Sequence, residues 1–183
     1  MPARKQITKD MIIKAALKIL REEGYEAVNI KELARELNCS TQPVYLSFAG
    51  MDELRDELAP AAVDFFEKYM KQDSEDNTVR LYGMEYIRFA KSEPRLFWYL
   101  FMRAHSFAEI KTLLHPIIEK SIEELMTEYN ISYEEVDLLH DRMWMQAHGI
   151  AAMTATDFCD WDMDKAARML AKSCMDFTAK YKR

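Results

Sequence analysis

Apolar residues recur at helical spacing along almost the whole chain. In the first such stretch, Thr8–Glu23, they fall at positions 12, 15, 16, 19 and 20, which form one face of a helix. Gly24 follows where a glycine commonly ends a helix. A second, short helix is predicted from Ile30 to Leu37, because Asn29 precedes it and Glu32 follows three residues later, which is the spacing of a capping box.

A third short helix is predicted after a tight turn at Asn38, since asparagine tolerates the left-handed conformation. We expect Ser40 to cap this helix and Pro43 to lie in its first turn. Val44 and Phe48 lie four residues apart and should face inward. Two short helices joined by a tight turn and braced by a preceding helix form a helix-turn-helix, whose second helix can enter the major groove of DNA.

The remaining chain is predicted to be helical throughout, without strands. A long connecting helix is expected from Asp52 to about Gln72, with a bend near Pro60, which removes a backbone hydrogen bond. Loops are expected at residues 73–77 and 157–164. The other predicted helices span Thr78–Ser92, Pro94–His105, Pro116–Tyr129, Glu134–Thr156 and Asp164–Tyr181.

Composition agrees with this all-α interpretation and excludes several classes of protein. The 183 residues include only 4 Gly and 5 Pro, too few for the tight turns of an all-β fold. The three cysteines form no CxxC or Cys/His cluster, so we expect reduced thiols in a cytoplasmic protein and no metal site. We also expect no signal peptide, no membrane span, no cofactor and no enzymatic activity, because no corresponding motif occurs.

The charges are distributed unevenly. Residues 1–50 contain eight basic and six acidic residues, a net charge of +2, whereas the whole chain carries -6 and the remainder therefore -8. A basic head on an acidic body is the asymmetry expected if only the head approaches phosphates. A solvated lysine-rich face gives the same pattern.

Residues 8–54 resemble the DNA-binding head of the tetracycline-repressor (TetR) family. The matching positions are Ala15-Ala16, Leu20, Gly24-Tyr25, Ile30, Leu33-Ala34, Leu37, Ser40, Tyr45, Phe48 and Glu53-Leu54. Residues 86–101 and the motif Trp144-x-x-x-His148-Gly149 resemble a C-terminal domain of this family that is named for its Trp, His and Gly. The resemblance implies an all-α fold with a helix-turn-helix head, residues 1–50, and a helical-bundle domain for ligand binding and dimerisation, residues 51–183.

The resemblance also implies a ligand-responsive repressor that binds an inverted-repeat operator as a homodimer. The recognition helix carries no charge here, although many members of the family have Lys-Gly at Thr41-Gln42. We expect Gln42 to read adenine and the methyl group of Thr41 to meet thymine. Contacts to the DNA backbone are expected from Tyr45, Ser47, Asn29, Arg4 and Lys5.

An aromatic and methionine-rich group in the body suits a pocket for a small apolar or aromatic effector, or else a solid core. The expected ligand-binding residues are Trp98, Met102, His105, Trp144 and His148. Dimerisation is expected through Glu134–Thr156 and Asp164–Tyr181, which resemble the family's dimerisation pair.

Two alternatives remain open. The neutral recognition helix also suits a helical binding or scaffold protein that uses this fold without recognising specific DNA. Cys39, in the turn of the helix-turn-helix, is either a redox sensor or a small hydrophobic residue.

Overall fold

The structure, a computed structural model, describes residues 6–71, 79–104 and 107–181. In these ranges the regular elements are helices, with no strand. The predicted all-α fold with a helix-turn-helix head is confirmed. The helices are α1 (Lys9–Glu23), α2 (Ile30–Glu36), α3 (Gln42–Ser47), α4 (Met51–Lys71), α5 (Val79–Ser92), α6 (Pro94–Phe101), α7 (Phe107–Tyr129), α8 (Tyr133–Ala155) and α9 (Met163–Thr178), with 3-10 turns at Tyr25–Ala27 and Ala179–Tyr181.

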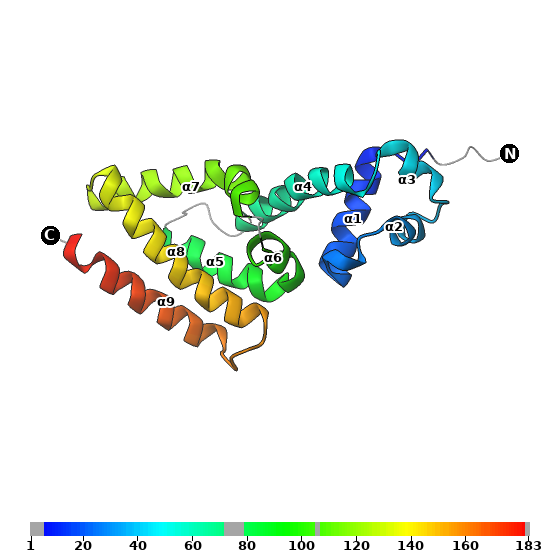
Figure 1. The fold of residues 1–183 in the computed structure, drawn as a ribbon. Coiled ribbons are helices and arrows are strands. Elements are labelled where there is room, and N and C mark those ends of the chain that lie inside the picture. Colours follow the sequence, from blue (N-terminus) through cyan, green and yellow to red (C-terminus); the bar gives the residue numbers. More distant parts are fainter. Residues whose placement is uncertain (1–5, 72–78, 105–106, 182–183) are drawn as a thin grey trace.

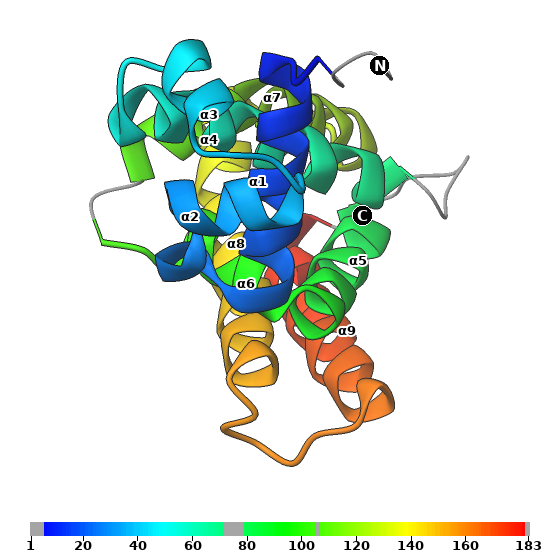
Figure 2. The ribbon, with the colours of Figure 1, turned by 90° about the vertical axis from the view of Figure 1, so that its right-hand side faces the viewer.

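The molecule is elongated, with a small head at one end and a larger body at the other (Figure 1). Helices α1, α2 and α3 form the head, and α4 runs from it into the body. Within the body α5 packs against α8, which also lies alongside α7 and α9 (Figures 1 and 2). The head and body are therefore joined mainly through α4 and through contacts of α1 with α6.

The ends of the head helices follow from their capping residues. The hydroxyl of Thr8 accepts a hydrogen bond from the backbone N–H of Met11, and Gly24 ends α1 with a φ of 97°. The side-chain oxygen of Asn29 accepts from the backbone amides of Lys31 and Glu32 at 3.1 Å each. Asn29 therefore caps α2, as predicted. The second bond of a capping box, from the backbone N–H of Asn29 to the side chain of Glu32, is not formed in the described part of the head.

Three predicted helix boundaries are wrong. Thr41, not Ser40, is the cap residue of α3, and its side chain makes no capping hydrogen bond. Helix α6 ends at Phe101 rather than continuing to His105. Helix α7 begins at Phe107, so Pro116 lies inside it. Proline is common at the start of a helix, but here the apolar pattern on both sides of Pro116 keeps one helix continuous.

One end of the body core is a stack of rings from α5, α6 and α8. The rings of Phe97 and Trp144 lie on the two sides of His148, with centroids 5.8 and 5.2 Å from its ring. Burial raises the pKa of Tyr86, and its hydroxyl shares a hydrogen bond with Nδ1 of His148 at 2.9 Å. Burial also lowers the pKa of His148 below 6.5, which favours the neutral imidazole.

Replacing Asn29 with alanine removes the acceptor of two backbone amides at the start of α2. We expect the free energy of unfolding to fall by about 1 kcal/mol, seen as a lower urea midpoint. Asn29→Asp keeps an oxygen at the cap and is the matched control, with a midpoint near that of the wild type. An unchanged midpoint for Asn29→Ala would contradict the capping role.

The buried imidazole of His148 should make stability depend on pH. Its pKa is lower in the folded than in the unfolded chain, so acid protonates the unfolded chain first. The contribution is present above pH 6.5 and is lost as the pH falls below it. We expect the urea midpoint to drop between about pH 7.5 and 5.5, and to drop less in His148→Gln. The exposed His115→Gln is the control, and an unaltered pH profile for His148→Gln would refute this role.

Candidate functional site

The short helix α3 exposes one uncharged stripe. Gln42, Tyr45 and Leu46 lie three and four residues apart and are exposed, with 63% of Tyr45 and 79% of Leu46 accessible to water. Val44 and Phe48 are buried on the opposite side, as predicted. The head therefore holds α3 by its inner face and presents an amide, a phenol and an aliphatic side chain outward.

Glu53 fixes α3 relative to α1 and α4. Its carboxylate accepts a hydrogen bond from the backbone N–H of Ala49 at 2.7 Å and from Nζ of Lys9 at 2.9 Å. The Ala49 amide, followed by Lys9, lowers the pKa of this carboxyl group. Lys9 also lies 4.8 Å from the ring centroid of Phe48, the residue that ends α3. The C-terminal end of the recognition helix is thus tied to its two neighbours.

The residues that were expected to contact DNA fall into three groups: exposed residues of α3, residues that form hydrogen bonds within the head, and residues outside the described ranges. Thr41, Gln42 and Tyr45 are exposed on α3 or at its start. Asn29, which also donates to the carbonyl of Ala27 at 3.1 Å, uses both ends of its amide within the head. Ser47 is half-buried and donates to the carbonyl of Pro43 at 2.9 Å. Arg4 and Lys5 lie outside the described residues.

Most cations described in the head have acidic neighbours. Lys14 pairs with Asp10 at 2.8 Å, Lys18 with Glu36 at 2.7 Å, and Arg35 with Glu23 at 3.1 Å; Arg21 and Lys9 also bind glutamates. In the described part of the head, Lys31 is the lysine for which no ion pair is recorded. Carboxylates beside the cations reduce the positive potential of the head, a feature that the net charge of +2 only partly indicated.

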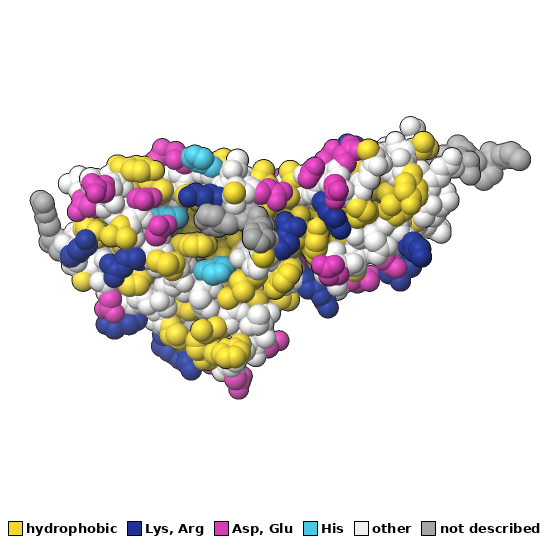
Figure 3. Space-filling view, viewed as in Figure 1, with side chains coloured by type: hydrophobic (Ala, Val, Ile, Leu, Met, Phe, Trp, Pro, Cys, Tyr) yellow, Lys and Arg dark blue, Asp and Glu magenta, His cyan; other side chains and the backbone are white. Residues whose placement is uncertain are grey.

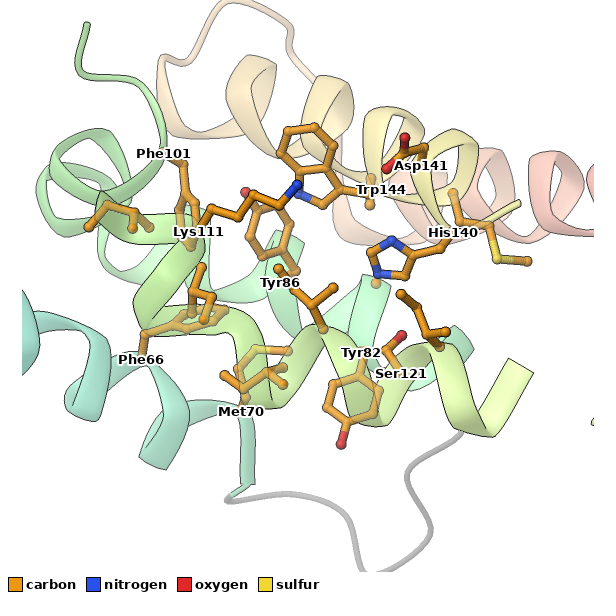
Figure 4. A pocket seen from close by; sticks show the side chains of 18 of the residues that line it. Phe66, Met70, Tyr82, Tyr86, Phe101, Lys111, Ser121, His140, Asp141 and Trp144 are labelled. Atoms are coloured by element: carbon orange, nitrogen blue, oxygen red, sulfur yellow. The ribbon is translucent and has the colours of Figure 1, made fainter. Parts of the chain in front are cut away.

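The body contains a cavity of about 290 Å³ between α4, α5, α6, α7, α8 and α9. Phe66 and Met70 reach it from α4, Tyr86 from α5, and Trp144 from α8 (Figure 4). Helix α7 contributes an aliphatic stretch of the wall: Ile110, Leu114, Ile117, Ile118 and Ile122. A largely apolar wall with a few polar groups is typical of a site for a small organic molecule.

Polar groups of the cavity come from α5, α7 and α8 and from Arg103, which lies after α6. Lys111, Ser121, His140 and Asp141 line it, together with Tyr82 (Figure 4). Burial lowers the pKa of His140, against the opposing effect of nearby carboxylates. The imidazole is therefore neutral at pH 7 and offers one donor and one acceptor.

The sequence identified only part of this cavity. Trp144 lines it, but Trp98, Met102 and His148 are absent from its wall. His105 lies outside the described residues. The apolar sequence around Trp98 suits a buried helix, but the Trp98 side chain itself is 47% exposed. His148 packs behind Trp144 in the ring stack.

The sequence-based ligand site missed the wall from α7. The helix was expected to begin at Pro116, so the turns that carry Ile110, Lys111 and Leu114 were not recognised as helical. The sequence did contain a signal for these turns. Ile110, Lys111 and Leu114 lie at i, i+1 and i+4, which is the spacing of one face of a helix.

Arg103 lies where the cavity meets the head. It lines the cavity and also a polar cleft of about 230 Å³ that includes Tyr25 of the head and Asp52 of α4. Its guanidinium lies 5.0 Å from the ring centroid of Tyr25 and 4.4 Å from that of Tyr99. Burial raises the pKa of Tyr99 to about 12, although Arg103 opposes this shift. Arg103 thus touches the head and the cavity at once.

Two other arginines join head and body without lining the cavity. Arg21 of α1 binds the carboxylate of Glu93 through two nitrogens, with Nε at 2.9 Å. Arg95 donates to the backbone carbonyl of Glu22. Unlike these two arginines, Arg103 contacts the head and also lines the cavity.

Exposed apolar side chains follow the outer faces of α8 and α9. Leu138, Met145 and Met153 lie along one stripe of α8 and are 61%, 57% and 38% exposed. Nothing lies within 4 Å of a Cβ built on Gly149, in the same stripe. Met175 of α9 is 44% exposed. In Figure 3 apolar side chains interrupt the charged ones over these helices and gather at the turn between them.

None of the described helices is long and apolar enough to cross a membrane. Within the same ranges, no three His, Cys, Asp or Glu side chains come together as a set of metal ligands.

The sequence and fold were compared with known proteins. Residues 12–58 match the family model described as "Bacterial regulatory proteins, tetR family". A search of curated proteins finds no match.

Several solved structures share the fold over nearly the whole chain. A TetR-like transcriptional regulator from Rhodococcus sp. RHA1 is 14% identical, with a TM-score of 0.68 and coverage of 96% of this chain and 98% of that one. A second transcriptional regulator from Rhodococcus gives 15% identity, a TM-score of 0.70 and coverage of 93% and 96%. A TetR variant from Acinetobacter baumannii in complex with minocycline is 20% identical, with a TM-score of 0.57 and coverage of 97% of this chain and 99% of that one.

The family match covers the helix-turn-helix and the start of α4, and the structural likeness extends over head and body. Residues 12–58 therefore match the model of the bacterial tetR family, and head and body together have the fold of TetR-like transcriptional regulators.

Proposed function

We propose that the chain is a ligand-responsive repressor that binds an inverted-repeat operator as a cytoplasmic homodimer. Residues 1–50 form the DNA-binding domain, and residues 51–183 form the ligand-binding and dimerisation domain. The observation that carries this proposal is the exposed, uncharged stripe of α3, held rigidly by Glu53 and the buried Val44 and Phe48. Gln42, with Thr41 beside it, reads base edges, because a glutamine amide can bind adenine at two points.

Two copies are needed, because one short helix contacts too few base pairs for specificity. The stripe of α8 that contains Leu138, Met145, Gly149 and Met153 supports pairing of α8 and α9 with their counterparts in a second copy. Exposed apolar side chains along a helix are the chemistry of an obligate interface, which is more apolar than the rest of the surface.

The effector is a small, largely apolar or aromatic molecule that occupies the cavity behind Trp144. Lys111, Ser121 and neutral His140 orient its polar groups. Phe66 and Met70 belong to the helix that starts at the head, so an occupant that displaces them also moves α4. The helix is continuous through Pro60, and the bend expected there stays a prediction.

Arg103 provides a second route from cavity to head. A ligand that draws its guanidinium toward the cavity weakens its contact with Tyr25, and a ligand that leaves it in place does not. The ligand changes DNA affinity only by the difference in its affinity for the two head positions. Head position and ligand binding are thereby coupled.

A scaffold protein without DNA specificity is the alternative, favoured by the pairing of the head's cations with carboxylates. The two functions differ in one measurement. Selection from random duplex DNA should enrich an inverted repeat that binds two protomers. Failure to enrich any sequence would favour the scaffold function.

Gln42→Ala should relax the preference at one base pair of each half-site, by about 10- to 100-fold against the preferred base. Lys31→Ala is the control, because removing a positive charge from the head should weaken all sequences alike and lower the salt dependence. Tyr45→Phe should also weaken all sequences similarly. If Gln42→Ala selects the same site with the same preference, Gln42 is not a reader.

Small aromatic compounds that raise the melting temperature should change the affinity for the selected operator by roughly 5- to 150-fold. Ile118→Trp, which fills the cavity, should abolish their binding. Arg103→Leu should still bind them but transmit less of the change to DNA. Arg95→Leu, which removes a head–body contact remote from the cavity, is the matched control. Equal coupling in Arg103→Leu and the wild type would exclude the Arg103 route.

A further inference from the structure

Leu46 is exposed in a place where the head itself gains nothing from a leucine. Its side chain is 79% accessible to water, although it lies on the helix between the buried Val44 and Phe48. Those two residues face the core, and Leu46 faces away from it. A large aliphatic group left in water gives up the stabilisation that burial would supply, so the exposed leucine does not stabilise the free head.

The position of Leu46 on α3 indicates what covers it. Leu46 lies one helical turn after Gln42 and beside Tyr45, in the stripe that faces outward. When Gln42 binds a base edge in the major groove, Leu46 lies over a base pair next to it. The edges of the bases in that groove carry hydrogen-bond donors, hydrogen-bond acceptors and one apolar group, the C5-methyl of thymine.

We propose that Leu46 packs against the C5-methyl group of a thymine close to the base pair read by Gln42, and so determines sequence preference. This inference rests on the proposed DNA-binding function. Leucine has no polar side-chain atom, so it gains nothing from phosphate oxygens or from the edge of a G·C pair. Burying its methyl groups against thymine removes apolar surface from water on both molecules.

Because carboxylates neutralise many cations of the head, such a contact supplies a larger share of the affinity for the operator. Lys14, Lys18 and Arg35 have carboxylate neighbours, so the phosphate term that dominates non-specific binding is small. A larger share of operator affinity must then come from contacts in the groove. Leu46 supplies the apolar part of these contacts, and Gln42 the polar part.

The test uses uracil, which pairs like thymine but lacks the methyl group. Each thymine of the operator selected from random DNA is replaced in turn by uracil, and affinity is measured for the wild type and for Leu46→Ala. At one position in each half-site, uracil should weaken binding of the wild type roughly three- to ten-fold. Leu46→Ala should bind the thymine operator correspondingly less well and be indifferent to uracil there.

Tyr45→Phe is the matched control, since it alters the neighbouring exposed side chain but keeps Leu46; it should retain the response to uracil. Unfolding of Leu46→Ala is expected to match the wild type, because the residue is exposed, and equal melting temperatures establish this. If no operator is enriched, the proposed function fails. If an operator is bound but uracil affects the wild type and Leu46→Ala equally at every position, Leu46 is not a thymine reader, and the DNA-binding function stands.

Discussion

One hydrophobic core runs from the head into the body along α4, and the rest of the structure depends on this continuity. Near its start Leu54 and Leu58 are fully buried, and α4 packs against α1 of the head. Near its end Phe66 and Met70 are buried among α5 and α7 and line the cavity. The helix has 21 residues, extends about 30 Å and is continuous through Pro60, which lacks a backbone N–H. Head and cavity are therefore connected by one continuous helix.

The contacts beside α4 determine how freely the head can turn on the body. Arg21 binds Glu93, Arg95 binds the carbonyl of Glu22, and Arg103 lies against Tyr25. These contacts are polar and partly exposed, so each contributes little compared with the buried face of α4. Such a junction keeps the head attached through α4 and leaves its angle to be set by a few weak contacts. A sensor needs this arrangement, because a fully apolar junction resists rotation.

Local chemistry made the head predictable from sequence. Asn29, Gly24 and Asn38 act through their own backbone or through amides a few residues away, and the structure has them as expected, with Asn38 at a φ of 49°. The inward positions of Val44 and Phe48 followed from helical spacing alone. The misplaced cap at Ser40 shows the limit, because the first turn of α3 begins without any side-chain hydrogen bond.

The cavity was less predictable, because it depends on how six helices pack. Composition identified aromatic and methionine residues, but whether Trp98 faces inward is decided by the neighbours of α6, and these leave it 47% exposed. Because Pro116 was interpreted as the start of α7, the predicted helix was too short. The aliphatic residues before Pro116 were therefore not assigned to the cavity wall. The exposure of Leu46 was equally hidden, since an apolar residue in a short helix is normally assigned to the core.

The energies at the head–body junction also match what a regulator requires. A partly exposed cation–π contact contributes about 0.5–1 kcal/mol, and a surface ion pair about 0–1 kcal/mol. Coupling between an effector and DNA typically amounts to about 1–3 kcal/mol. The contact of Arg103 with Tyr25 and Tyr99, together with one neighbouring ion pair, is thus large enough to bias the head. The proposed effector could reverse a contact of this size, because a much stronger junction would exceed the differential affinity that a molecule in a cavity of about 290 Å³ supplies.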